Sequence, residues 1–235
     1  MNKKYYRLDR LLVNLGYGVR PEVRLFIKNG FVKYKDESIR DFTVKLNPKY
    51  ITFNGKPLER YNGLYILMHK PSGYISSHDY ENSIYHLLPP QWLDRRPKVN
   101  CVGRLDKDSS GLILLTDNGQ FLHNIISPRK KIKKIYRITT KEPMSKEMIN
   151  RLSAGTIHLK GEKNPCLPIN VDSIDDLNVN VTLYEGKYHQ LKRMFGSIGN
   201  KIVKLERIQI GEFLLDGLRS GEWRDLTDNE INKYI

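Results

Sequence analysis

The chain has 235 residues, of which 39% are hydrophobic and 10% aromatic, so it can fill a core and is not of the disordered class. Its 40 Lys and Arg residues exceed its 26 Asp and Glu residues, and the formal net charge of +14 favours a polyanionic partner. The longest apolar runs, such as 64–68, are far shorter than the ~18 residues of a membrane-spanning helix, and no signal segment follows Met1. We therefore expect neither a membrane protein nor a secreted one.

Two cysteines, Cys101 and Cys166, lack the CxxC spacing of zinc and redox motifs. Reduced thiols in a cytoplasmic protein are the simplest interpretation.

The positive charge is concentrated at the start of the chain. Residues 1–60 contain 14 Lys and Arg against 6 Asp and Glu, a surplus of eight, whereas residues 61–235 contain 26 against 20, a surplus of six. Phosphate contacts scale with the number of basic side chains, so this distribution favours a small polyanion-binding module in front of a larger body. A merely solubilising surface is the alternative.

The first 60 residues predict two short helices followed by a hairpin. Leucines 8, 11, 12 and 15 recur at helical spacing and Gly16 follows them, while a second helix begins near Pro21 and ends before Gly30. Extended segments are expected at 31–34 and 42–44, and Asn54-Gly55 is typical of a hairpin turn.

Residues 61–63 are short and polar and are predicted as a linker, so that the second domain covers 64–235. This domain predicts a mixed fold with a substantial sheet. Strands are expected at 64–68, 112–116, 135–140, 157–160, 179–183 and 202–208, and helices at 145–153, 191–198 and 228–234. The fold class is α+β.

The densest chemical signal is the run from Gly103 to Gly119, in which Asp106 stands two residues after Arg104 and precedes a buried strand. Glycines allow close approach to a ligand, and a loop before a strand presents a side chain on a rigid support. Asp106 is therefore a candidate nucleophile, base or metal ligand; a turn aspartate bonded to its own backbone is the alternative.

Five ordered segments carry a family resemblance. Residues 5–50 resemble an S4-type RNA-binding domain through 7–12, Val19-Arg20 and 28–32. The segments 67–74, 103–119, 134–137 and 185–195 resemble the motifs of RsuA-type pseudouridine synthases, which act on small-subunit ribosomal RNA and carry an N-terminal S4 domain. Ser109-Ser110 stands where the family usually has Thr-Ser or Thr-Thr, a change that retains the hydroxyls.

The resemblance implies a fold and a reaction. The expected fold is a small S4-like domain of helices and a hairpin, followed by a catalytic domain with a mixed, mainly antiparallel sheet. The expected reaction isomerises a uridine of folded RNA: the base is cleaved from C1′, rotated and rejoined through C5, with no cofactor.

The resemblance also assigns roles to single residues. It makes Asp106 the catalytic aspartate, either as nucleophile or as an electrostatic and proton-transfer group, and Tyr136 the ring that packs on the flipped base. Lys192 matches the basic residue that pairs with the aspartate, and Arg104 the residue that helps extrude the base. A core tyrosine at 136 and a surface lysine at 192 are the alternatives, and His189 lies in the last motif without an assigned role.

Two basic sets are expected to contact RNA. One lies on a single face of the second helix, at i, i+4 and i+8, and comprises Arg20, Arg24 and Lys28. The other precedes Tyr136 as a track into the active site and comprises Arg129, Lys130, Lys131, Lys133 and Lys134. For both sets a solvated surface is the alternative.

Other cofactors and partners are not indicated. The six histidines show no metal-ligand spacing, and neither a GxGxxG nor a Walker-type motif occurs, so no metal, dinucleotide or nucleotide cofactor is expected. The expected partner is ribosomal RNA or a partly assembled small subunit, bound by a monomer. The alternatives are a synthase for large-subunit RNA, disfavoured by Tyr188-His189 where those relatives tend to have Asn-Arg, and a non-catalytic assembly factor.

Overall fold

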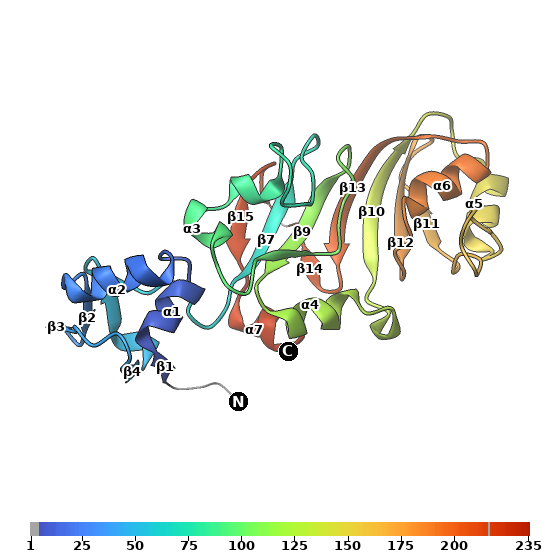
Figure 1. Cartoon of the computed structure of the whole chain (residues 1–235). Helices are drawn as coiled ribbons and strands as arrows, with labels where there is room; N and C mark the ends of the chain where they lie inside the picture. The colour runs from blue at the N-terminus through green and yellow to red at the C-terminus, as the bar shows by residue number, and fades with distance from the viewer. Residues whose placement is uncertain (1–4, 216) are drawn as a thin grey trace. The chain divides into compact units, whose positions relative to one another are not determined.

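The computed structural model describes residues 5–215 and 217–235 (Figure 1). Contacts divide it into two compact units. The first holds the described residues up to 65 together with 85–100 and 115–118, and the second holds 66–84, 101–114 and the described residues from 119 onward. No helix of the described residues is long and apolar enough to cross a membrane.

The first unit packs two short helices on small sheets. Its elements are β1 (Tyr6–Arg7), α1 (Leu8–Asn14), α2 (Arg20–Lys28), β2 (Val32–Tyr34), β3 (Glu37–Ser38), β4 (Lys45–Leu46), η1 (Pro48–Tyr50), β5 (Ile51–Phe53), β6 (Lys56–Pro57) and α3 (Pro90–Leu93). Strand β1 pairs with β4, and the order β3-β2-β5-β6 forms a second sheet. The four leucines of the predicted stripe are buried together with Val23 and Ile27, which confirms both predicted helices.

One predicted strand of this unit is wrong. Residues 42–43 form a turn, and β4 begins only at Lys45. The cause is Asp41, whose Oδ1 accepts hydrogen bonds from the backbone N (2.8 Å) and the hydroxyl (2.7 Å) of Thr43. Such a side-chain bond to the backbone offers an alternative to strand pairing.

The second unit is built on a nine-stranded sheet. The remaining elements of the chain are β7 (Tyr65–Lys70), η2 (Ile84–Leu87), β8 (Asn100–Val102), β9 (Ser110–Thr116), α4 (Gly119–Ile126), η3 (Pro128–Lys130), β10 (Lys134–Thr140), α5 (Lys146–Ser153), β11 (Asn170–Ser173), β12 (Asn178–Leu183), α6 (Gln190–Ser197), β13 (Ile202–Ile210), β14 (Phe213–Leu214), β15 (Trp223–Asp225) and α7 (Asp228–Asn232). The strand order is β11-β12-β10-β13-β9-β7-β15, with β14 beside β13 and β8 beside β9.

The sheet is mixed and mainly antiparallel, as predicted. Strands β9 and β13 pair in parallel, whereas β10 pairs antiparallel with both β12 and β13. Helices α5 and α6 cover the β11–β12 end of the sheet (Figure 1). They bury Leu152, Met194 and Phe195 against Val179 and Val181. The same core includes Leu105 and Tyr136, which lie beside the site described below.

The predicted strand at 157–160 is wrong. These residues form an irregular segment in which the carbonyl of Ile157 accepts from the N–H of Cys166 (2.8 Å) and that of Leu159 from Glu162 (3.0 Å). Leu159 is buried and Ile157 packs against the same core. The alternating apolar pattern therefore reflects a loop folded onto the core and not a paired strand.

Candidate active site

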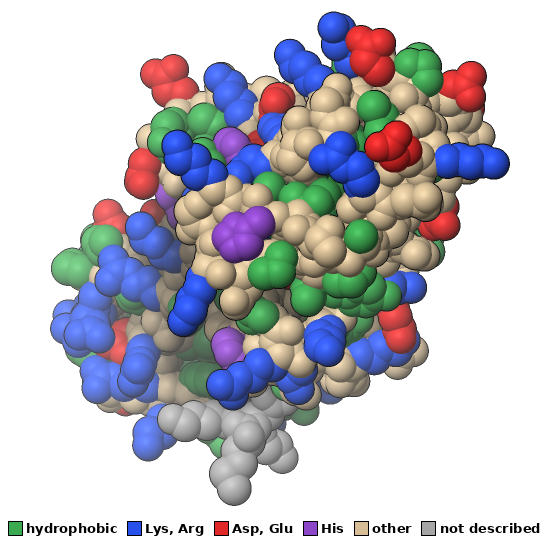
Figure 2. All heavy atoms as spheres, turned by 90° about the vertical axis from the view of Figure 1, so that its right-hand side faces the viewer, with side chains coloured by type: hydrophobic (Ala, Val, Ile, Leu, Met, Phe, Trp, Pro, Cys, Tyr) green, Lys and Arg blue, Asp and Glu red, His purple; other side chains and the backbone are tan. Residues whose placement is uncertain are grey.

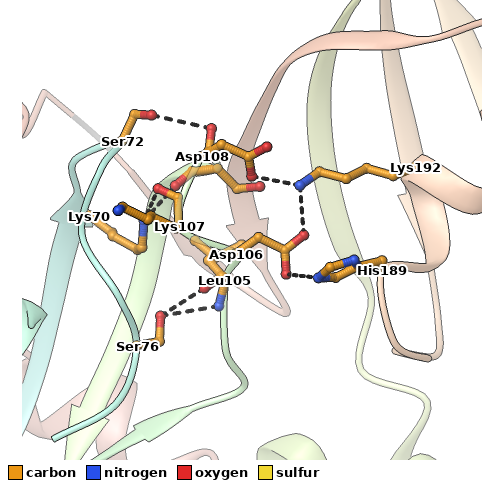
Figure 3. A network of polar contacts seen from close by, with 10 residues as sticks. Lys70, Ser72, Ser76, Leu105, Asp106, Lys107, Asp108, His189 and Lys192 are labelled. Carbon is orange, nitrogen blue, oxygen red and sulfur yellow. Dashed lines mark hydrogen bonds and ion pairs between the residues drawn. The ribbon is translucent and has the colours of Figure 1, made fainter. Parts of the chain in front are cut away.

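The Asp106 loop connects β8 to β9 and is held from both sides. The backbone N–H of Ser109 donates to the carbonyl of Asp106 (3.1 Å), which closes a tight turn. The hydroxyl of Ser76 donates to the carbonyl of Leu105 (3.0 Å) and accepts from its N–H (3.3 Å). The backbone on both sides of the carboxylate is thus fixed by hydrogen bonds (Figure 3).

Gly111 allows the loop to enter the sheet. It pairs in parallel with Arg207 of β13, and its φ is 104°. A Cβ atom there would lie 2.3 Å from the carbonyl oxygen of Arg207. The close approach expected of this glycine is therefore to a neighbouring strand and not to a ligand.

The Asp106 carboxylate has two partners from the start of α6. Its Oδ2 lies 2.9 Å from Nζ of Lys192, and its Oδ1 lies 3.2 Å from Nε2 of His189. His189 precedes α6 in the left-handed conformation, with φ of 44°, and so turns its ring toward the Asp106 loop. The predicted pairing of Asp106 with Lys192 is present in the structure.

The Lys192 ammonium is shared between two carboxylates. Besides Asp106, it contacts Oδ1 of Asp108 at 2.6 Å. Burial lowers the pKa of Lys192, but hydrogen bonds to Asp108 and Asp106 outweigh this effect and raise the pKa above its usual value. The same hydrogen bond lowers the pKa of Asp108. Lys192 is therefore a cation throughout the neutral pH range.

A second lysine, Lys70, binds the backbone of the Asp106 loop. Lys70, at the end of β7, is fully buried, and its Nζ donates to the carbonyls of Ser109 (2.6 Å), Pro71 (2.9 Å) and Lys107 (3.4 Å). Burial lowers its pKa to about 8, against the opposing effect of the Asp108 and Asp106 charges. Lys70 therefore binds the backbone of the Asp106 loop, and within the described part of the chain its Nζ forms no ion pair with the carboxylates of that loop.

A pocket of about 240 Å³ opens beside Asp106. It is lined by residues 103–106, 126–128, 183–187 and 189–192, and by Ser109, Lys134, Tyr136, Leu205 and Arg207. We call it the aspartate pocket. Its size is on the scale of one nucleoside.

Tyr136 and Arg207 face each other across β10 and β13 and both line the aspartate pocket. Tyr136 is only 8% exposed and belongs to the core that includes Leu105, so it is at once a core tyrosine and a wall of the pocket. Arg207 is buried, and its guanidinium donates to the carbonyls of Leu112 (2.7 Å) and Gly103 (3.2 Å).

The predicted RNA-contacting residues fall into three groups. Arg104 and Lys134 line the aspartate pocket, and burial together with the charge of Arg207 lowers the pKa of Lys134. The exposed residues of the predicted track lie just after the pocket-lining Ser127 and Pro128 and comprise Arg129, Lys130, Lys131 and Lys133. The α2 set belongs to the first unit and comprises Arg20, Arg24 and Lys28.

Within the α2 set, Arg24 differs from its neighbours. Its Nη2 lies 3.3 Å from the carboxylate of the buried Asp9, and its guanidinium lies over the ring of Phe42 at 4.5 Å. Arg24 thus has structural partners within the unit. Arg20 is exposed, and its side chain forms no hydrogen bond or ion pair with other described residues, whereas the Nζ of Lys28 lies 5.9 Å from the centroid of the same ring.

Sequence reasoning missed four residues of the site: Lys70, Asp108, His189 and Arg207. Lys70 stands in a recognised segment, but its role depends on three carbonyls that only the fold brings to its Nζ. Arg207 lies in a predicted strand, where nothing local marks it as a pocket residue. Among the described residues, no group of three or more His, Cys, Asp or Glu side chains is placed to hold a metal ion.

Comparison with known proteins identifies the family. Residues 64–197 match the family model described as RNA pseudouridylate synthase. The chain is 38% identical over 235 residues to ribosomal small subunit pseudouridine synthase A of Haemophilus influenzae, covering 97% of this chain and 99% of the relative. It is 35% identical over 233 residues to an uncharacterized RNA pseudouridine synthase, YtzG, of Bacillus subtilis, covering 96% and 97%.

A solved structure gives the same result for the fold. The crystal structure of a pseudouridylate synthase superimposes with a TM-score of 0.69 at 37% identity, covering 97% of this chain and 99% of that one. The match spans both units, which agrees with the predicted resemblance over nearly the full length. The chain therefore belongs to the RNA pseudouridylate synthase family and is an RNA pseudouridine synthase.

Proposed function

We propose that this enzyme isomerises a specific uridine to pseudouridine in small-subunit (16S) ribosomal RNA, without a cofactor. Relatives named for the small ribosomal subunit support this substrate: besides the H. influenzae protein, the Escherichia coli protein of the same name is 37% identical and covers 89% of this chain. The observation that carries the chemistry is the Asp106 carboxylate, held between Lys192 and His189 at the wall of a nucleoside-sized pocket.

The proposed reaction needs no external group. The bond from N1 of uracil to C1′ breaks, the base turns, and C5 bonds to C1′, while the proton of C5 leaves and N1 gains one. Asp106 acts on the flipped uridine as nucleophile or as electrostatic and proton-transfer group, and Lys192 and His189 hold its two oxygens in place. Preorganised partners of this kind cost no reorganisation during the reaction.

Tyr136 packs on the flipped base in this proposal. A largely buried ring at the pocket wall offers a flat apolar surface that replaces the stacking lost when the base leaves the RNA helix. Arg104 is exposed at the pocket and helps to extrude the base.

The basic side chains bind the RNA backbone. Residues 1–60 form the S4-like RNA-binding domain, joined through 61–63 to a catalytic domain at 64–235, and the track at 129–134 leads phosphates toward the aspartate pocket. Lys and Arg side chains lie at many points of the face drawn in Figure 2. Neither Cys101 nor Cys166 takes part in a disulfide among the described residues, which agrees with the cytoplasmic location that we propose. We also propose that the enzyme is a monomer.

The decisive experiment measures tritium release from uridine labelled at C5. Small-subunit RNA, large-subunit RNA and partly assembled particles of each are compared with wild-type protein and Asp106→Asn. We expect release from a small-subunit substrate that Asp106→Asn abolishes, while Asp172→Asn, an exposed carboxylate on β11, retains it. Release from large-subunit RNA alone would replace the proposed substrate, and release by Asp106→Asn would overturn the proposed role of the carboxylate.

The same assay tests the partner of Asp106. Lys192→Met leaves the carboxylate without its ammonium donor, so we expect kcat to fall on the order of 10²-fold, as for loss of one preorganised donor. Lys192→Arg is expected to restore part of the activity, and Lys201→Met, on the exposed surface, serves as the control. Turnover by Lys192→Met at the wild-type rate would show that Lys192 is a surface lysine.

A further inference from the structure

A second pocket adjoins the aspartate pocket. It has a volume of about 450 Å³ and is lined by residues 75–77, Tyr80, 104–107 and 186–189. We call it the flanking pocket. The two pockets share Arg104, Leu105 and Asp106 on one side and Gly186, Lys187 and His189 on the other. Because the two pockets share these walls, one RNA strand could extend from the aspartate pocket into the flanking pocket.

Tyr188 is the aromatic wall of the flanking pocket. Its side chain is 69% exposed, the highest value among the large apolar side chains of the described residues. One face of the ring stacks on His189, with centroids 3.9 Å apart and planes inclined by 18°. His189 in turn contacts Asp106. The other face of a ring so exposed is available to a second flat group.

Tyr80 adds a second exposed ring to the same pocket, with 53% of its side chain accessible. The hydration of an exposed aromatic ring is unfavourable in the free protein. Proteins that bind single-stranded nucleic acids use such rings as stacking surfaces, because every base has a flat face. Two exposed tyrosines on one pocket beside the reaction site are thus suited to an unpaired base.

The charge of the flanking pocket suits a phosphate. Arg104 and Lys107 are exposed, and neither side chain forms a hydrogen bond or ion pair with the described residues. Lys187 adds a third charge, although its Nζ already donates to the carbonyls of Asn164 (2.7 Å) and Pro165 (3.0 Å). Asp106 is the one carboxylate among the described lining residues, and Lys192 already pairs with it.

We propose that the flanking pocket binds the nucleotide next to the target uridine, with its base stacked on Tyr188 and its phosphate near Arg104 and Lys107. This inference rests on the proposed function, because it requires the target uridine to occupy the aspartate pocket. The neighbouring base is then held outside the RNA helix together with the target. Since every base can stack on a tyrosine ring, this contact adds binding energy whatever the base at that position.

The test combines a protein change with an RNA change. Tyr188→Ala is compared with wild type on the modified RNA and on copies in which the nucleotide immediately before or after the target lacks its base. Tritium release at varied RNA concentration gives kcat/KM. We expect Tyr188→Ala to lower kcat/KM on intact RNA by about 5- to 150-fold, the range of one lost stacking contact. Tyr188→Phe should recover most of this loss.

The decisive quantity is the coupling between the Tyr188→Ala substitution and the removal of the neighbouring base. On RNA lacking the stacked base, wild type should lose a similar factor and Tyr188→Ala should add no further loss. If Tyr188→Ala costs the same factor on every RNA, the ring acts only on His189 and the inference is overturned; it is also overturned if Tyr188→Ala has no effect on intact RNA. Ile174→Ala, which removes an exposed side chain lining neither pocket, controls for general damage.

Failure of the proposed function gives a different result. In that case wild-type protein releases no tritium from any intact RNA, and the flanking-nucleotide inference falls with it. Release by wild type without coupling to Tyr188 leaves the function standing and removes the inference alone.

Discussion

Lys70 is a buried cation whose burial has a measurable consequence for stability. Its pKa is about 8 in the folded protein against an ordinary value of 10.5. Between these two values the unfolded chain binds more protons than the folded one, so the contribution of Lys70 to the free energy of unfolding rises with pH across this window. Below pH 8 both states are protonated and the cost of burying the ammonium is constant.

We predict that wild type gains stability relative to Lys70→Met on the order of 1 kcal/mol between about pH 7.5 and about pH 9.5. Methionine has a similar length but does not titrate, so the difference between the two proteins isolates Lys70. Urea unfolding at both pH values measures it. A difference that stays constant, or that shifts against wild type at high pH, would show that the Lys70 pKa is not lowered by burial.

At the level of single residues, the family resemblance identified Asp106, Tyr136 and Lys192 as candidates, but not the residues that hold them in place. Asp106 stands in a recognisable run, and its pairing with Lys192 is present at 2.9 Å. His189 and Arg207 gain their positions from a left-handed turn before α6 and from the pairing of β13 with β9. The pairing of β13 with β9 joins residues 96 positions apart, as between Arg207 and Gly111, and no window of sequence contains such a contact.

At the scale of elements, apolar periodicity predicted most of the long elements, although it missed helix α4 (Gly119–Ile126). Strands β9, β10, β12 and β13 and helices α5 and α6 all fall within a few residues of their predicted bounds, because each carries a continuous apolar face. The short strands β8, β11, β14 and β15 were missed, since two to four residues give too little pattern and their pairing is set by the longer neighbours.

Gly111 joins the Asp106 loop to the sheet at one backbone position. We predict that Gly111→Ala lowers the free energy of unfolding by ~2 kcal/mol or more, since the new methyl group meets the Arg207 carbonyl at 2.3 Å and φ is 104°. Gly119→Ala, where no heavy atom lies within 4 Å of the added Cβ, should change it by less than ~0.5 kcal/mol. Chemical denaturation of both variants makes the comparison, and equal stabilities would contradict the crowding at Gly111.

For the whole molecule, the contribution of the excess positive charge to RNA binding is best tested by substituting basic residues and not by deleting the first 60 residues. In the first unit the N–H of Arg96 donates to the carbonyl of Asn14 (2.9 Å), and the Gln91 side chain donates to that of Leu15 (3.1 Å). Removing residues 1–60 would therefore also disrupt the segment at 85–100, and a change in RNA binding would have two possible causes.

Substitution at Arg20 and Lys28 avoids this problem. We predict that Arg20→Gln combined with Lys28→Gln weakens RNA binding and reduces the slope of log K against log salt concentration by about 1 to 2, as two phosphate contacts are lost. Arg24 is spared because it pairs with Asp9. Lys146→Gln with Lys201→Gln removes the same charge from the second unit and should leave the slope unchanged. A slope equal in both double variants would show that the α2 face only adds solubility.

The division of Lys192 between two carboxylates affects the energy of any intermediate in which Asp106 loses its charge. A lone ammonium at a half-enclosed site would then lack a counterion, at a cost of several kcal/mol for a fully buried group. Asp108 lies 2.6 Å from the Lys192 ammonium and lines neither pocket, so it remains beside Lys192 as a second anion. In such an intermediate Lys192 would therefore keep an ion pair with Asp108, and the cost of an unpaired ammonium would be avoided.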